Sequence, residues 1–366
     1  MSKITQETVS KISTEIESLK NKEFTVFFFV YDTKGVPSGS IANIYETALA
    51  LKADGYLVKM LHADKDFVGV RSWMGDKAAD LPHEYVDKDA EIAVHPSDFL
   101  IIPEIYTSVM SVTKKLPCKR IVFWQNSKFI YDTIPMGVDL ADMNIMDVLT
   151  TSEDLAERIK NQLPGVVTAV DRPCVPDYFV PSVEPRELVI NILTKTPQEA
   201  NEILKPFYWR YPSMNWVAFR NIKDLPRKEF AEAISKSVAT VWCDRDTDFG
   251  HMALEAMACG NIVIGRVPDK MPEWMKGENG EGIADNGLWF YDTIDAKDLI
   301  DLVVNHFISD TIPQELYENM KKTVAYYSEA NFRADVKKTF EKYTENRIKE
   351  FELAEKVYKS KVEESE

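Results

Sequence analysis

The sequence contains few of the residues that hold metals or form disulfides. Its four cysteines, Cys118, Cys174, Cys243 and Cys259, form no C-x-x-C pair, and its five histidines form no H-E-x-x-H motif. Scattered cysteines argue against a zinc site and are typical of a reducing compartment. We therefore expect no metal site and a cytoplasmic protein.

Long apolar runs and an excess of positive charge are also missing. The longest apolar run, about residues 24–31, is far shorter than the roughly 20 residues of a membrane helix. The polar residues 1–7 do not resemble a secretory signal. We expect no transmembrane segment. The formal net charge of −15 disfavours a nucleic-acid partner, because affinity for polyanions comes from Lys and Arg that neutralise phosphates.

The sequence does contain apolar strands and helices that alternate in two halves. A chain of 366 residues, 45% of them hydrophobic, is long enough for two globular domains. Strands are predicted at 24–31, 56–61, 99–103, 120–124 and 147–151, and then at 188–193, 216–219, 239–242, 262–264 and 287–291. Runs that are apolar on both faces indicate parallel sheets covered by helices. Four prolines between 173 and 185 separate the halves, because proline interrupts a sheet.

Helices are predicted at both ends of the chain. Apolar residues at near-helical spacing in 4–20 predict an amphipathic helix that covers a domain face or a second subunit. A homo-oligomer formed through this helix is one expectation. Residues 344–366 are rich in Glu and Lys and predict a helical extension without a chemical role.

The most informative segment is residues 246–265, which predict a turn, a short helix and a buried strand around one carboxylate. The helix is expected from about 251 to 259 and ends at Gly260, a residue type that favours the backbone conformation found after helices. Glu255 lies in this helix among residues that favour burial. Because a buried unpaired charge is costly, we expect a ligand to be its partner.

Phe249-Gly250 followed by Leu254 to Gly260 resembles the E-x7-E signature of retaining glycosyltransferases with the GT-B fold, of the group 1, family 4-like type. Looser similarity extends over about 24–343. The resemblance implies an α/β protein with two Rossmann-like domains, 1–178 and 179–326, that face a central cleft. A C-terminal segment, 327–366, is expected to cross back to the first domain as a helix with a charged extension.

The activity implied by the resemblance is metal-independent transfer of a hexose or pentose with retention. The donor would be a nucleotide sugar, with UDP or GDP as the nucleotide, and no cofactor is needed. The acceptor would be a glycan, a lipid or a small molecule, and nucleic acid is disfavoured by the charge. In this family the second domain binds the donor and the first domain receives the acceptor.

The resemblance also implies a donor site. Glu255 would accept hydrogen bonds from the ribose hydroxyls, and backbone N–H groups at the helix start would receive the diphosphate, as orphan N–H groups and the helix dipole allow. A glycine after the first strand would let the phosphates or the acceptor approach the backbone. The donor-site residues expected in this way are Gly39, Lys195, Thr247, Phe249, Gly250, His251, Met252, Ala253 and Glu255.

One position departs from the family pattern. Thr247 stands where the first Glu is usual, and it is flanked by Asp246 and Asp248. We expect one of these Asp residues to contact the donor sugar instead. Both, together with His251, are the candidate catalytic residues.

Polar residues also follow a predicted strand of the first half. Gln125 and Asn126 come directly after strand 120–124. Ligands of open α/β sheets bind at the carboxyl ends of the strands, and related glycosyltransferases carry polar residues here that contact the acceptor or the sugar. We assign these two residues to the acceptor side.

Other functions remain open. A GT-B epimerase would convert a nucleotide sugar without an acceptor, and a non-catalytic homologue is suggested by Thr247. A phage-type DNA glycosyltransferase acting on a hydroxymethylated base would share the fold. A dehydrogenase that uses Gly35, Gly39 and Asp64 is disfavoured, because the glycine spacing is not G-x-G-x-x-G.

Overall fold

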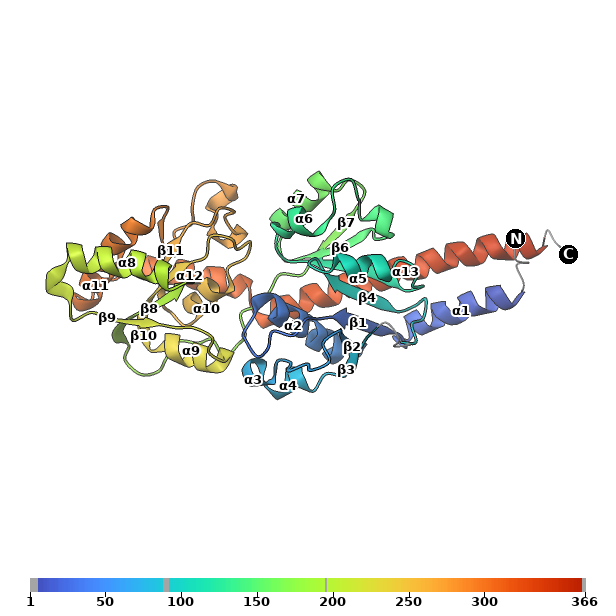
Figure 1. Ribbon diagram of the computed structural model, residues 1–366, viewed down its shortest axis with the longest axis horizontal. Helices are drawn as coiled ribbons and strands as arrows, with labels where there is room; N and C mark the ends of the chain where they lie inside the picture. The colour runs from blue at the N-terminus through green and yellow to red at the C-terminus, as the bar shows by residue number, and fades with distance from the viewer. Residues whose placement is uncertain (1–5, 88–91, 195, 364–366) are drawn as a thin grey trace.

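The computed structural model describes residues 6–87, 92–194 and 196–363 as two α/β domains that lie side by side (Figure 1). Each domain is built around a parallel sheet. In the described part of the chain the strand orders are β3-β2-β1-β4-β5-β6-β7 and β12-β11-β10-β8-β9. The parallel sheets predicted from the apolar runs are confirmed.

The sheet of the first domain is buried on both faces. Its strands are β1 (Thr25–Phe29), β2 (Leu57–His62), β3 (His83–Tyr85), β4 (Phe99–Pro103), β5 (Lys119–Trp124), β6 (Asp147–Thr150) and β7 (Val167–Val170). Its helices are α2 (Gly39–Ala53), α3 (Arg71–Met74), α4 (Asp76–Ala79), α5 (Thr107–Val112), α6 (Phe129–Thr133), η1 (Ala141–Met143) and α7 (Glu153–Gln162). Along β1, Val26 and Phe28 enter one core while Phe27 and Phe29 enter the other, as the alternation of side chains along a strand requires.

The second domain repeats this plan with fewer strands. They are β8 (Glu187–Thr194), β9 (Ala218–Asn221), β10 (Ser237–Cys243), β11 (Ile262–Arg266) and β12 (Leu288–Phe290). Its helices are α8 (Pro197–Arg210), η2 (Pro212–Met214), α9 (Arg227–Ser235), α10 (His251–Ala258), η3 (Glu273–Met275), η4 (Glu278–Gly280), η5 (Thr293–Asp295), α11 (Ala296–Ile308) and α12 (Gln314–Tyr326).

One strand of the second domain begins later than the sequence predicts. The expected strand at 216–219 is β9 at Ala218–Asn221, because the residues before it form a turn in which the Val217 N–H donates to Met214 O (3.0 Å). The remaining predicted strands differ from the observed ones by a few residues at their ends, where element boundaries are poorly defined in any case.

The long helix α13 (Glu329–Glu363) packs on the first domain although it follows the second in sequence (Figure 1). Phe332, Val336, Phe340 and Tyr343 enter the same core as β1 and α2. Beyond this core, α13 lies beside α1 (Gln6–Lys20), whose predicted apolar face is covered in this way by the same chain. None of the described helices is both long enough and apolar enough to span a membrane.

The chain passes between the domains twice, and the two passes lie side by side. At the first pass, Cys174 belongs to the core of the first domain and Val175 to that of the second. At the second pass, Tyr327 belongs to the second core and Phe332 to the first. The Val175 N–H donates to Tyr327 O (2.8 Å), which joins the two passes.

We expect Phe340→Ala to lower the free energy of unfolding of the first domain by about 3–5 kcal/mol, because it removes a large side chain from a packed core. Phe340 is only 1% exposed. Leu353→Ala on the same helix is the control, since Leu353 is 65% exposed. Urea unfolding of both variants measures the effect, and equal loss of stability in the two would contradict the packing of α13.

Candidate functional site

A cavity of about 600 Å³ lies between the two domains. The first domain contributes residues 37–40 at the start of α2, Trp73, and residues 125–126 after β5. The second domain contributes the ends of β8 and β10, Arg227, and much of the segment 242–255. Ligand sites of α/β proteins are common at such domain interfaces and at strand ends. The cavity therefore has the position expected of a ligand site.

The turn between β10 and α10 is shaped by one threonine and one glycine. Thr247 Oγ1 accepts hydrogen bonds from the N–H groups of Phe249 (3.3 Å) and Gly250 (2.9 Å), a local pattern that stabilises turns. Gly250 has φ +77°, and a Cβ there would lie 2.8 Å from the ring of Trp242. Only glycine fits this position. The Thr247 hydroxyl is thus engaged by its own turn.

Two helix N-termini meet at the cavity. Gly39 is the first residue of α2, and its missing Cβ lets the backbone approach the imidazole of His251, whose Nδ1 would lie 3.2 Å from a Cβ at that position. His251 is the first residue of α10. N–H groups in the first turn of a helix have no helical acceptor, and the dipole places positive charge there. The two N-termini together form a site suited to an anion.

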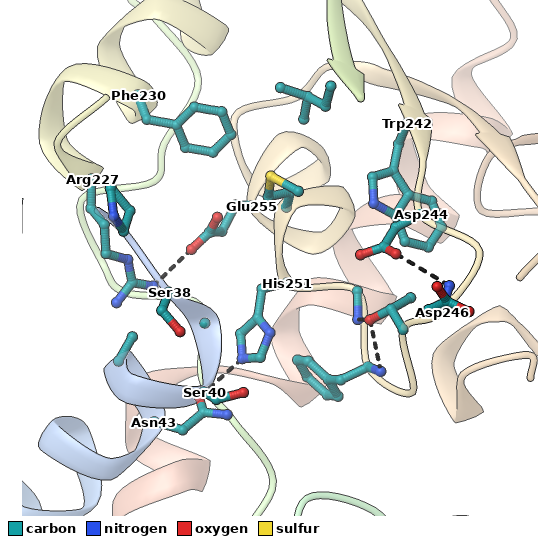
Figure 2. A pocket seen from close by; sticks show the side chains of 18 of the residues that line it. Ser38, Ser40, Asn43, Arg227, Phe230, Trp242, Asp244, Asp246, His251 and Glu255 are labelled. Carbon is teal, nitrogen blue, oxygen red and sulfur yellow. Dashed lines mark hydrogen bonds and ion pairs between the residues drawn. The ribbon is translucent and has the colours of Figure 1, made fainter. Parts of the chain in front are cut away.

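The carboxylate of Glu255 has a protein partner. Arg227 Nη2 donates to Glu255 Oε1 at 2.7 Å, and Figure 2 shows the two side chains meeting at one wall of the cavity. Glu255, for which a ligand is the expected partner, is therefore not an unpaired charge, because the guanidinium at the start of α9 reaches it. Arg227 also donates through Nη1 to Glu46 of α2. A buried charge cluster therefore joins the two domains.

His251 stands at the end of a hydrogen-bond chain with a fixed direction. A backbone carbonyl can only accept, so Gln125 Nε2 donates to Ser40 O (3.0 Å) and its Oε1 accepts from Asn43 Nδ2 (2.9 Å). Asn43 Oδ1 is then left to accept from His251 Nε2 (2.9 Å) (Figure 2). His251 consequently carries its proton on Nε2 and presents Nδ1 as an acceptor.

The imidazole of His251 is neutral at physiological pH. Its burial, with the positive charge of Arg227 as a smaller cause, lowers the pKa of His251 to about 3. His251 therefore offers no positive charge to a phosphate. What it can do is accept a hydrogen bond at Nδ1.

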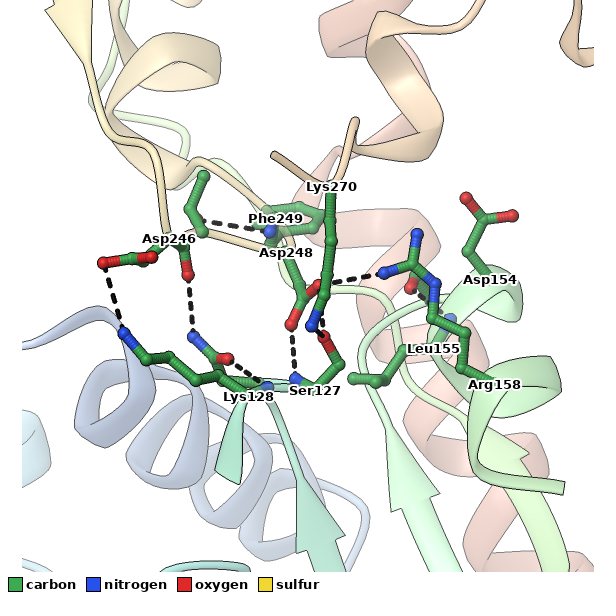
Figure 3. Close-up of polar contacts among 12 residues, drawn as sticks. Ser127, Lys128, Asp154, Leu155, Arg158, Asp246, Asp248, Phe249 and Lys270 are labelled. Atoms are coloured by element: carbon green, nitrogen blue, oxygen red, sulfur yellow. Dashed lines mark hydrogen bonds and ion pairs between the residues drawn. The ribbon is translucent and has the colours of Figure 1, made fainter. Parts of the chain in front are cut away.

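The acidic turn of the second domain contacts the loop after β5 in the first domain (Figure 3). Asp248 is bonded to the Ser127 N–H and to Ser127 Oγ (2.9 Å), and Arg158 lies 3.6 Å from its carboxylate. Asp246 lies 3.4 Å from the ammonium of Lys128 and has a 53% exposed side chain, against 7% for Asp248. Of the two carboxylates, that of Asp246 is the more available to a ligand.

The structure brings most of the expected site residues to one cavity. Gly39, Gln125, Asn126, Asp246, Thr247, Asp248, Phe249, Gly250, His251, Met252 and Glu255 all line it. Lys195 lies outside the described residues.

Some of the expected donor-site residues are engaged by the protein itself. The Ala253 N–H donates to Gly250 O (3.1 Å), and the Gly250 N–H donates to Thr247 Oγ1. Within the described part of the chain this leaves the N–H groups of His251 and Met252 for an anion at the start of α10. Asn126 Nδ2 donates to Asp246 O (3.0 Å) and so contacts the second domain.

Three residues of the site were not expected from the sequence. Asn43 and Glu46 lie on α2, and Arg227 is the first residue of α9. A sequence signal existed only for Arg227, since a cation at a helix N-terminus opposes the helix dipole and indicates a specific partner.

Comparison with known proteins gives a sequence match over part of the chain. No family model matches the chain. A curated alpha-1,6-glucosyltransferase of Actinobacillus pleuropneumoniae serotype 7 (strain AP76) is 26% identical over 181 residues. These residues make up 48% of this chain and 54% of that protein, so the similarity extends over about half of each.

Solved structures share the fold over most of this chain. A glycosyltransferase from Rickettsia africae ESF-5 has a TM-score of 0.60 at 15% identity and covers 88% of this chain and 98% of its own. The pneumococcal O-GlcNAc transferase GtfA, solved with UDP and GlcNAc, has a TM-score of 0.59 at 9% identity, covering 89% and 99%. An alpha-glucosyltransferase solved with UDP and a DNA 13-mer has a TM-score of 0.54 at 12% identity, covering 89% and 99%. The expected α/β fold of GT-B type is confirmed.

We expect the stability contributed by His251 to depend on pH. Between about pH 6.5 and 3 the unfolded chain binds a proton on this residue and the folded protein does not, so wild type loses up to about 1.4 kcal/mol per pH unit as the pH falls. His251→Asn removes this titration and can still donate to Asn43. Urea unfolding of both proteins from pH 3.5 to 7.5 measures the difference, and parallel curves would contradict the neutral, buried imidazole.

Proposed function

We propose that this protein is a glycosyltransferase that moves a sugar from a nucleoside-diphosphate donor to an acceptor in the cleft. The observation that carries the proposal is the meeting of two helix N-termini on one cavity, with Glu255 one turn further along α10. An anion site next to a carboxylate suits a ligand that carries both phosphates and a diol. The division into residues 1–178, 179–326 and 327–366 is part of this proposal.

The donor would lie across the start of α10. Its diphosphate would accept hydrogen bonds from the N–H groups of His251 and Met252, and Gly39 would allow it to approach α2. Its ribose hydroxyls would donate to Glu255, where Arg227 holds Oε1 and leaves lone pairs for the diol. This arrangement is supported by the fold shared with two proteins solved with UDP.

The chemical step would depend on stabilisation of the leaving diphosphate. Charge builds up on the diphosphate as the glycosidic bond breaks, and fixed N–H groups and helix dipoles stabilise such charge without reorganisation. We propose transfer with retention. Asp246, with its exposed carboxylate, would contact the donor sugar, and His251 Nδ1 would accept from a sugar hydroxyl. Asp248 would instead hold the first domain through Ser127.

The acceptor would be a hydroxyl of a glycan, or of a lipid or a small molecule. The partial match to an alpha-1,6-glucosyltransferase supports a sugar acceptor. The likeness to an alpha-glucosyltransferase solved with DNA would favour a hydroxymethylated base. The net charge of −15 opposes a polyanionic acceptor. We therefore propose a glycan as the acceptor in preference to DNA.

The proposal is tested with a thermal-shift panel of UDP, GDP and their sugars. A true donor nucleotide raises the melting temperature, because a ligand at a hundredfold excess over its dissociation constant adds about 2.7 kcal/mol. Glu255→Gln should weaken binding of that nucleotide by about 1–3 kcal/mol, through loss of charge-assisted hydrogen bonds to the ribose. Glu352→Gln on the exposed part of α13 is the control. A flat response of wild type to all nucleotides would refute the proposed function.

We expect sugar transfer to continue in EDTA. The two helix N-termini would supply the positive charge that a metal ion supplies elsewhere. The measurement is turnover of the best donor, monitored as release of the nucleotide with and without chelator. Loss of turnover that manganese or magnesium restores would assign a metal to the acidic turn at 244–248 and overturn the metal-independent mechanism.

A further inference from the structure

One buried arginine connects the expected ribose carboxylate to the opposite domain. Arg227 is bonded through Nη2 to Glu255 Oε1 and through Nη1 to Glu46 Oε1. The side chains of Glu46, Arg227 and Glu255 are 12%, 10% and 7% exposed. A guanidinium is a planar fork whose edges can serve two carboxylates at once. The orientation of this fork therefore depends on both domains.

Two residues of the interdomain segment contact Glu46 and Arg227. The Cys174 thiol lies 3.8 Å from Glu46 Oε2, and the guanidinium of Arg227 lies over the ring of Phe179 at 5.9 Å. Cys174 and Phe179 belong to the segment in which the chain passes from one domain to the other. The charge cluster thus lies beside the segment that connects the domains, and relative motion of the domains would change its contacts.

A second contact sets the same two helices in register. Asn43 lies one turn before Glu46 on α2, and His251 lies one turn before Glu255 on α10. Asn43 is bonded to His251 directly, while Glu46 reaches Glu255 through Arg227. Consecutive turns of α2 are therefore linked to consecutive turns of α10, the first directly and the second through Arg227. Opening of the cleft would break both contacts together.

Separation of the domains would change what holds Glu255. Without Glu46, one edge of the Arg227 fork would lose its carboxylate, and the guanidinium would be free to rotate about its long side chain. The hydrogen bond to Glu255 Oε1 would then lose its fixed direction. While the cleft is closed, a buried charge that lost one of its partners would be destabilised, so the closed arrangement favours intact pairing of Glu46 with Arg227.

We propose that Glu46 and Arg227 are positioning residues for the nucleotide: Glu46, on the first domain, orients Arg227, and Arg227 orients the Glu255 carboxylate toward the ribose. The proposal rests on the donor site described under Proposed function. In this arrangement the ribose site is complete only when the cleft is closed, so nucleotide binding and domain closure favour each other. Donor affinity is thereby controlled from the domain that receives the acceptor.

The test combines nucleotide affinity with the distance between the domains. Glu46→Met keeps the size of the side chain and removes both oxygens, Glu46→Gln restores one acceptor, and Arg227→Lys keeps the charge but loses the fork. Glu350→Met is the matched control, because Glu350 pairs with Lys119 within the first domain, away from the cleft. Calorimetric titration with UDP, and with GDP if UDP does not bind, gives the dissociation constants.

Spin labels report closure. They are attached at Val112→Cys on the first domain and Ile308→Cys on the second, two exposed positions, while the four native cysteines are buried. We expect Glu46→Met and Arg227→Lys to raise the dissociation constant at least tenfold and to lengthen the interdomain distance without nucleotide. Glu46→Gln should recover part of the affinity, and Glu350→Met should behave as wild type.

The outcomes separate this inference from the proposed function. If wild type binds neither UDP nor GDP, the proposed function fails and the inference fails with it. If wild type binds and Glu46→Met stays within twofold, the inference alone is overturned, even where the melting temperature falls, since a purely structural ion pair would lower stability without changing affinity. Longer distances with unchanged affinity would likewise show that Glu255 is oriented without α2.

Discussion

The close approach of α2 to α10 across the cleft determines the rest of the candidate site. Two helices that point their N-termini at one space repel each other through their dipoles. The groups that meet at the first turns of the two helices add no positive charge to this repulsion, and the charge of Arg227 further along is balanced by Glu46 and Glu255. Gly39 brings no side chain, and His251 is neutral and bonded to Asn43. What remains at the start of α10 is a pair of N–H groups, those of His251 and Met252, in a setting that favours an anion.

The parts of the molecule that could be predicted from the sequence are those whose structure depends on residues close together in the chain. The β10–turn–α10–β11 unit followed from an apolar run, a short helical stretch and Gly260, and it lies where it was expected. Ser152, a residue type favoured at the start of helices, precedes α7 and accepts from the Leu155 N–H. The parallel sheets followed from strands that are apolar on both faces. In each case the signal and the structure involve residues a few positions apart.

The parts that could not be predicted depend on residues far apart in sequence. Arg227 and Glu46 are 181 positions apart, and Ser127 and Asp248 are 121 positions apart. No periodicity connects such pairs, because their contact is decided by how the two domains meet. For the same reason Glu255 was expected to lack a protein partner. The acidic turn predicts a carboxylate at the donor sugar, whereas Asp248 is bonded to Ser127 of the other domain.

The adjacent passes of the chain between the domains make the second domain an insertion within the first. The chain leaves the first domain near Val175 and returns to it near Tyr327. These two points are neighbours, joined by the hydrogen bond between Val175 N–H and Tyr327 O. After the return, α13 completes the core of the first domain. A module with such close ends can be exchanged as one block without cutting the fold that receives it. Under the proposed division of roles, recombination at two neighbouring points would exchange the nucleotide-binding domain, while the surface proposed for the acceptor stays the same.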